Sequence, residues 1–177
     1  MFYLSYKDGQ QNPEVYEITK KSNNTLKVKY SDIDFPTLQI NENGDWIDIK
    51  CAKDYDLHAG ESAKIDLGVA MKLPEGYEAW LAPRSSTFDK YGIIQTNSIG
   101  VIDNSYSGNN DIWKMPVYAM RDTVIKKGDR LCQFRLVPKM SQLFNGLTSG
   151  FGISYLKIVE VLELDSNDRG GFGSTGR

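Results

Sequence analysis

The segment Gly100-Val101-Ile102-Asp103 carries the side chain best suited to catalysis in this sequence. Two β-branched residues followed by an aspartate, and then by a turn that closes at Gly108, predict a hairpin with Asp103 at the end of a strand. An aspartate in this place is either a turn former bonded to its own backbone or a general base that activates water. Tyr106 is either ordinary packing in the hairpin or a flat wall against a sugar.

A second group of candidates, Pro83-Arg84-Ser85-Ser86, joins a predicted strand to a predicted short helix. Backbone amides, two hydroxyls and a guanidinium at a helix N-terminus form an anion site, although serine there more often only caps the helix. Gln133 is a polar residue in an otherwise apolar strand. If Gln133 lies on the same face as Ser85, it is placed to bind a phosphate, and otherwise it faces solvent.

The C-terminal run 165–177 sets Arg169, Phe172 and Ser174 among four glycines. This composition is typical of a disordered chain end. It also contains what a phosphate clamp needs, because glycine amides approach anions closely, arginine bonds in a bidentate way and an aromatic ring can cover a base. Both interpretations remain open from the residues alone.

The composition excludes several classes of protein. Two cysteines are too few for a disulfide framework or a cysteine-rich metal site and indicate a reducing cytoplasm. A single histidine, His58, excludes histidine zinc clusters and leaves the chemistry to carboxylates, hydroxyls, amides and arginines. The net charge of −2 argues against a nucleic-acid-coating surface. No apolar run approaches the ~20 residues that cross a membrane, so we expect a cytoplasmic protein without a membrane partner.

The elements that must position these residues are strands. Apolar residues alternate with polar ones in 26–30, 64–73 and 132–136, and turn signals recur between such runs. One short helix is predicted over 87–91, with Ser85 or Ser86 as N-cap and Gly92 after its end. The sequence therefore predicts an all-β sandwich or jelly roll with one short helix. Its single domain spans 26–164, preceded by a loose extension or added hairpin (1–25) and followed by a mobile C-terminal arm (165–177).

Five segments in sequence order resemble the five motifs of the homotrimeric dUTP diphosphatases, the dUTPases. The segments are residues 44–49, 83–86, 97–108, 128–133 and 169–176, and the resemblance covers the chain from about residue 26 to its end. Each motif alone is weakly specific, whereas five with compatible spacing are strongly specific. The runs Gly44-Asp45-Trp46-Ile47-Asp48 and Glu75-Gly76-Tyr77 are most similar to the enzymes of Gram-positive bacteria and their phages.

The resemblance implies hydrolysis of dUTP to dUMP and diphosphate, which limits uracil in DNA and supplies dUMP for thymidylate synthesis. It implies that Asp103 activates water for attack on the α-phosphorus. Backbone groups around Gly100, Val101 and Ile102, with Asn97, would hold uracil. Tyr106 would pack under deoxyribose and clash with a ribose 2′-hydroxyl.

The resemblance also implies how the triphosphate is held. Phosphate ligands would be Arg84, Ser85, Ser86 and Gln133, while Arg169, Gly173 and Ser174 would close over the β and γ phosphates. Asp48 would support the site indirectly. Mg²⁺ would be held by triphosphate oxygens and water, with no direct protein ligand. Each site would form between subunits of a distorted jelly-roll homotrimer, with the arm lending the fifth motif.

The sequence departs from the common family pattern in three places. Trp46 replaces the usual alanine–glycine start of the first motif. Ser107 stands where arginine is frequent, and Asn109-Asn110-Asp111 is a local expansion of the hairpin. The aromatic run after this point keeps only Trp113, so Phe172 is the first choice for the lid that stacks on the base and Trp113 the second.

Two alternative functions stay open. One is a dUTPase-like protein that binds a regulatory protein through 1–25 or 109–111, a role compatible with enzymatic activity. A dCTP deaminase-like nucleotide enzyme is the other alternative, against which Ile102, Asp103 and Tyr106 and the glycine-rich tail argue.

Overall fold

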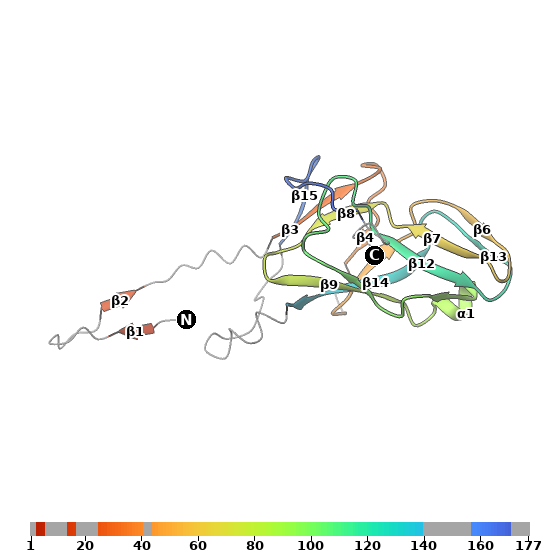
Figure 1. Cartoon of the computed structure of the whole chain (residues 1–177), viewed down its shortest axis with the longest axis horizontal. Coiled ribbons are helices and arrows are strands. Elements are labelled where there is room, and N and C mark those ends of the chain that lie inside the picture. The colour runs from red at the N-terminus through yellow and green to blue at the C-terminus, as the bar shows by residue number, and fades with distance from the viewer. Residues whose placement is uncertain (1–2, 6–13, 17–24, 41–43, 140–156, 171–177) are drawn as a thin grey trace.

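In the computed structural model, residues 3–5, 14–16, 25–40, 44–139 and 157–170 of the chain are described (Figure 1). Except for one short helix, the regular elements in these residues are strands. In chain order they are β1 (Tyr3–Ser5), β2 (Glu14–Tyr16), β3 (Thr25–Tyr30), β4 (Leu38–Gln39), β5 (Ile47–Lys50), β6 (Tyr55–Leu57), β7 (Ser62–Asp66), β8 (Val69–Lys72), β9 (Tyr77–Pro83), α1 (Thr87–Tyr91), β10 (Ile93–Gln95), β11 (Gly100–Ile102), β12 (Lys114–Ala119), β13 (Thr123–Ile125), β14 (Arg130–Pro138) and β15 (Lys157–Glu160).

The largest sheet has the strand order β11-β9-β14-β5-β4 and is antiparallel throughout. Two three-stranded sheets, β10-β12-β7 and β15-β3-β8, lie against the same hydrophobic core, and β6 pairs with β13. This arrangement confirms the predicted all-β sandwich. The strands β1 and β2 form an antiparallel pair that lies apart from the other sheets (Figure 1).

Alternation of apolar and charged residues places β3 as predicted, because Leu26 and Val28 are fully buried while Lys27 and Lys29 are partly exposed. The run 64–73 also buries every second residue from Ile65 to Leu73. The prediction of one long strand there is wrong, however. Gly68 adopts a φ of 65°, which breaks the run into β7 and β8, and these two strands join different sheets.

The predicted helix is present as α1. Ser86 is its N-cap, and Gly92 ends it in the left-handed conformation, φ 61°, with its N–H donating to Phe88 O at 2.7 Å. The Ser86 hydroxyl makes no capping hydrogen bond, so the serine side chain is not needed for helix formation. Within the described ranges no helix is both long and apolar enough to cross a membrane.

Candidate active site

Asp103 follows β11 directly, as predicted, and its side chain is exposed. Its Oδ2 accepts a hydrogen bond from Arg169 Nη1 at 2.6 Å, an ion pair between residues far apart in the chain. Its backbone carbonyl accepts the N–H of Tyr106 at 3.0 Å in a turn. Asp103 is therefore both a turn residue and an exposed carboxylate paired with an arginine.

The predicted hairpin around Asp103 is wrong. β11 pairs with β9, whereas the next strand, β12, pairs with β10 and β7. The residues between β11 and β12 therefore form a loop that crosses from one sheet to another. The loop brings Tyr106 against the core, where its hydroxyl donates to Ile112 O at 3.2 Å. Burial, with Asp111 and Asp168 nearby, raises the pKa of Tyr106 above its ordinary value.

Arg84 lies at the opposite end of β9. Its Nε donates to Oδ1 of Asp48 at 2.9 Å, and the side chain of Asp48 is only 6% exposed. Arg130 approaches the other oxygen of Asp48 at 3.4 Å. Asp48 is thus the buried counter-charge of two arginines, and its supporting role in the site stays a prediction.

Thr87 fastens the turn that carries Arg84, Ser85 and Ser86. Its buried hydroxyl donates to Leu131 O at 2.6 Å and accepts the N–H of Arg84 at 3.1 Å. These bonds tie the turn to β14, and the Ser86 hydroxyl makes no capping hydrogen bond. A shallow depression of about 390 Å³ borders the turn and is lined by Arg84, Ser85, Phe88, Ile94 and Gln95 with three neighbours.

Gln133 lies on β14, which pairs with β5 on one side and β9 on the other. In the sheet register it is opposite Asp48 on β5 and Ala82 on β9, and it is half-buried. Directly opposite residues in a sheet point to the same face. Gln133 therefore shares a face with Asp48, whose carboxylate binds Arg84.

The predicted uracil-binding residues come together near β11. Gly100 is buried against Leu81, and an added Cβ there would approach Leu81 Cβ to 3.3 Å, tighter than ordinary contact. Asn97 is exposed, and its Oδ1 accepts a hydrogen bond from Gln95 Nε2 at 2.9 Å. Val101 is exposed and Ile102 half-buried. Gly100 is therefore packed closely on Leu81, whereas its neighbour Val101 faces solvent.

Asp103 and Arg84 are far apart within one chain. Ile102 pairs with Ala79, so Asp103 lies opposite Glu78, six residues before Arg84 along β9. At about 3.3 Å per residue this separation is roughly 20 Å. A general base must be within hydrogen-bonding reach of the water it activates, so this separation matters for any site that is to include both the Asp103 carboxylate and the turn 84–86.

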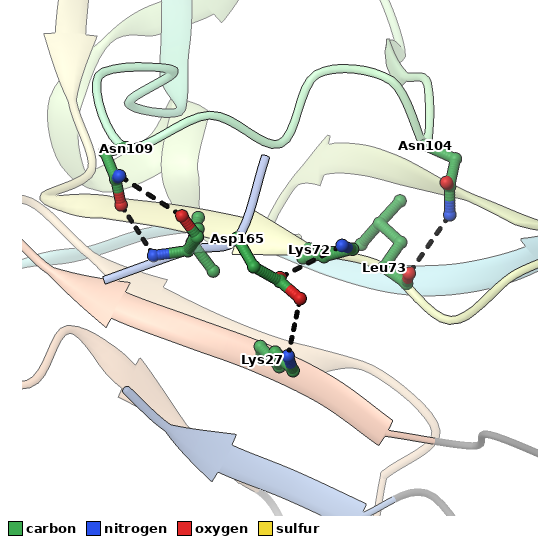
Figure 2. Close-up of polar contacts among 7 residues, drawn as sticks. Lys27, Lys72, Leu73, Asn104, Asn109 and Asp165 are labelled. Carbon is green, nitrogen blue, oxygen red and sulfur yellow. Dashed lines mark hydrogen bonds and ion pairs between the residues drawn. The ribbon is translucent and has the colours of Figure 1, made fainter. Parts of the chain in front are cut away.

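The beginning of the predicted arm is bonded to the rest of the domain. Lys72 and Lys27 both bind Asp165 (Figure 2), and these contacts lower the pKa of Asp165 to about 2. Amide groups of Asn110 lower the pKa of Asp168. Phe172, Gly173 and Ser174 lie outside the described residues.

Trp113 is not available as a lid. It is 1% exposed and packs edge-to-face on Phe134, with 5.2 Å between ring centroids. A ring enclosed in the core cannot stack on a base, so the prediction of Trp113 as second choice for the lid is wrong. Trp113 belongs to the packing that supports the strands.

A protein metal site needs several acidic, histidine or cysteine side chains close together. Over the ranges that the structure describes, no three histidine, cysteine or acidic residues gather closely enough to hold an ion. Asp48 and Asp103 both face arginines. Because Mg²⁺ commonly binds substrate phosphates and keeps several waters, this set of residues fits a metal that arrives with a triphosphate.

Three further polar residues near the predicted site, Thr87, Arg130 and Gln95, are not among those predicted from the sequence. Thr87 and Arg130 lie inside or next to the motifs named above. Only the structure shows that Thr87 bonds to Leu131 and that Arg130 pairs with Asp48. Gln95 is buried and directs Asn97 through a hydrogen bond. Nothing in local sequence periodicity distinguishes these polar residues from solvent-facing ones.

A family model for dUTPases matches residues 36–176. The SPbeta prophage-derived deoxyuridine 5′-triphosphate nucleotidohydrolase YosS of Bacillus subtilis strain 168 is 50% identical over 151 residues, which cover 85% of this chain and 97% of that protein. A crystal structure of dUTPase from Streptococcus mutans has a TM-score of 0.58 at 24% identity and covers 64% of this chain and 96% of that one.

A further structural neighbour is a dUTPase variant from phage phi11 of S. aureus, described as coordinating a structural Mg(II) ion. It has a TM-score of 0.57 at 22% identity, over 64% of this chain and 90% of that one. These likenesses to solved structures concern the fold.

Proposed function

The chain belongs to the dUTPase family and hydrolyses dUTP to dUMP and diphosphate, and we propose that Asp103 activates the attacking water. Asp103 takes one proton from water while the oxygen bonds to the α-phosphorus. The bond from the α-phosphorus to the oxygen bridging to the β-phosphorus breaks, and diphosphate leaves. The exposed carboxylate at the end of β11 supports this role. His58, the only histidine in the sequence, lies beside Asp122 instead.

The observation that carries the proposal is the separation of Asp103 from Arg84 along β9. Since both groups must reach one triphosphate, Asp103 of one subunit acts with Arg84, Ser85, Ser86 and Gln133 of another. A closed ring of three subunits repeats this heterologous contact three times. The exposed, apolar cross-strand pair Val101 and Trp80 on β11 and β9 supports burial of this face in an oligomer.

The arginines supply the local positive charge that a protein of net charge −2 needs for a triphosphate. Arg84 and Arg169 bind phosphate oxygens, and their guanidinium groups offer two parallel donors to an anion. The Ser85 and Ser86 hydroxyls and the Gln133 amide add neutral donors. Gly173 and Ser174 join them from the arm, and Phe172 stacks on the base.

Uracil binding belongs to the loop that holds Asn97 and Gly100. Close packing of Gly100 on Leu81 keeps the backbone of β11 within reach of a flat base. Tyr106 lies under the deoxyribose, where its ring excludes a 2′-hydroxyl. Mg²⁺ bound to the triphosphate neutralises charge and fixes the phosphate conformation, since positioning and electrostatics dominate phosphoryl transfer.

The cytoplasm is the proposed location, because Cys51 and Cys132 are both buried and unpaired and a reducing compartment keeps them so. Binding of a regulatory protein stays a prediction, since no observation in the described residues favours it. The dCTP deaminase alternative is set aside, because the matching family and the named relative act as dUTP nucleotidohydrolases.

Mixed trimers test the shared site. Asp103→Asn and Arg84→Ala subunits, each inactive alone, are co-expressed with different tags, and trimers that carry both tags are purified. If Asp103 and Arg84 act across subunits, one site in each mixed trimer contains both native residues, so about one third of the native turnover returns. If both residues act within one subunit, mixing restores nothing and the proposal fails.

Substrate preference tests the base and sugar contacts. Diphosphate release is measured with dUTP, dTTP, dCTP and UTP, each with and without Mg²⁺. We expect strong preference for dUTP and dependence on Mg²⁺. Equal turnover of the four nucleotides would remove the assigned roles of Asn97, Gly100 and Tyr106.

A further inference from the structure

Asp111 is buried, with 1% of its surface exposed, and its carboxylate accepts three backbone N–H groups. Gly108 N and Arg169 N donate to Oδ2 at 2.9 and 2.7 Å, and Gly170 N donates to Oδ1 at 2.8 Å. Two of the three donors belong to a segment almost 60 residues further along the chain. We call residues 108–111 the docking loop and residues 164–170 the arm root.

The backbone of the arm root lies directly on Gly108. A Cβ added to Gly108 would overlap the Cα, N and Oδ1 of Asp168. Asn110 holds the same residue, since its backbone N and its Nδ2 donate to the two carboxylate oxygens of Asp168 at 2.8 and 2.6 Å. Glycine at 108 is therefore required by the close approach of another part of the chain.

Asn109 fixes the other end of the arm root. Its Oδ1 accepts the N–H of Leu164 at 2.6 Å, and its Nδ2 donates to Leu164 O at 3.2 Å. Figure 2 shows this pair of bonds. It also shows the two bonds that Asp165 accepts from Lys27 of β3 and Lys72 of β8. The run 109–111 thus gives each of its three side chains to the same segment.

We propose that Asp111 is a positioning residue, which docks the arm root and so holds Arg169 against Asp103. The inference rests on the proposed function in taking Asp103 and Arg169 as site residues. The ion pair between them follows from the docking, because the main chain of Arg169 is bonded to Asp111 while its side chain reaches Asp103.

Docking has a direct consequence for substrate binding. A free arm root would have to be ordered each time Arg169 binds a phosphate, and ordering a segment weakens binding. A docked root starts with Arg169 already at the site. Loss of Asp111 is therefore expected to raise KM more than it lowers kcat.

Limited digestion with trypsin tests the docking without any use of activity. Trypsin cleaves after Arg169, at the peptide bond to Gly170. The N–H of this bond donates to Asp111 Oδ1. The variants are Asp111→Asn, which turns an amide toward the donors, Gly108→Ala, which pushes on Asp168, and Asn110→Ala. The control is Asp56→Asn, the same chemical change at an exposed residue of β6. Intact mass reports the product that ends at residue 169.

We expect all three docking variants to be cleaved after Arg169 at least about tenfold faster than the native protein and the control, as loss of charge-assisted bonds predicts. KM for dUTP should rise about tenfold in Asp111→Asn, with kcat changed less. Native-like cleavage in all three variants would overturn the docking. Faster cleavage with unchanged KM would overturn the positioning of Arg169. If Asp103→Asn retained full turnover, the proposed function would fail while the digestion result would stand.

Discussion

The guanidinium of Arg169 lies 2.6 Å from the carboxylate of Asp103, and the two residues are separated by 66 positions in the sequence. The contact joins the candidate base at the end of β11 to the first residue of the last motif. It places a guanidinium, a group suited to binding phosphate, next to the carboxylate proposed as the base.

Asp103→Asn should remove turnover and keep the fold. Asp103 is exposed, so the change removes one surface ion pair, whereas loss of a general base lowers kcat by about 10²–10⁴. Steady-state kinetics give kcat, and calorimetric titration with dUTP in the slow variant gives affinity. Turnover at the native rate would contradict the assignment, and Asp56→Asn controls for the loss of a carboxylate.

Asp48→Asn should weaken both binding and stability. The buried carboxylate is the counter-charge of Arg84 and Arg130, and hydrogen bonds to charged groups contribute about 1.5–3 kcal/mol. We expect the free energy of unfolding to fall by an amount of this order and KM for dUTP to rise. Denaturation is measured at one fixed subunit concentration, because assembly changes apparent stability. An unchanged KM would show that Arg84 does not depend on Asp48.

Trp113→Phe should affect stability and spare substrate binding. The indole Nε1 is buried and has no hydrogen-bond partner in the described part of the chain, and the ring packs on Phe134. Loss of part of a core ring costs about 1–3 kcal/mol. A stacking lid would instead contribute about 1–3 kcal/mol to binding. A large increase in KM with an unchanged melting temperature would restore Trp113 as the lid.

Alkaline pH should destabilise the native protein more than a Cys51→Ala variant. Burial raises the pKa of the Cys51 thiol from 9.0 to about 11. The unfolded chain therefore releases this proton before the folded one does. The contribution is fully present below pH 9 and is lost as pH rises to about 11, by an amount of about 2 kcal/mol.

The check is chemical denaturation of both proteins between pH 8 and pH 11. Lysine and tyrosine residues are the same in the two proteins, so the difference between the curves isolates Cys51. Parallel curves would mean that the thiol titrates normally in the folded protein.

Local patterns in the sequence predicted the strands of the core, the helix α1 with Ser86 and Gly92 at its ends, and the five motifs in their order. These features depend on residues close in the chain, where alternation, turn chemistry and capping act. Gly68 shows the limit of such patterns. The alternation from Ile65 to Leu73 is real, yet a positive φ at one glycine divides it between two sheets.

Only the tertiary structure decided the arrangement of the site. The register of β11 on β9 separates Asp103 from Arg84, and Trp113 is enclosed by residues distant in sequence. In the sequence Asp111 stands out only as part of a local expansion after the third motif. Its hydrogen bonds with the arm root are visible only in the structure. Such contacts are long-range, and their partners follow from the packing of the whole chain. The sequence by itself determined the chemistry present, and the fold determined which groups meet.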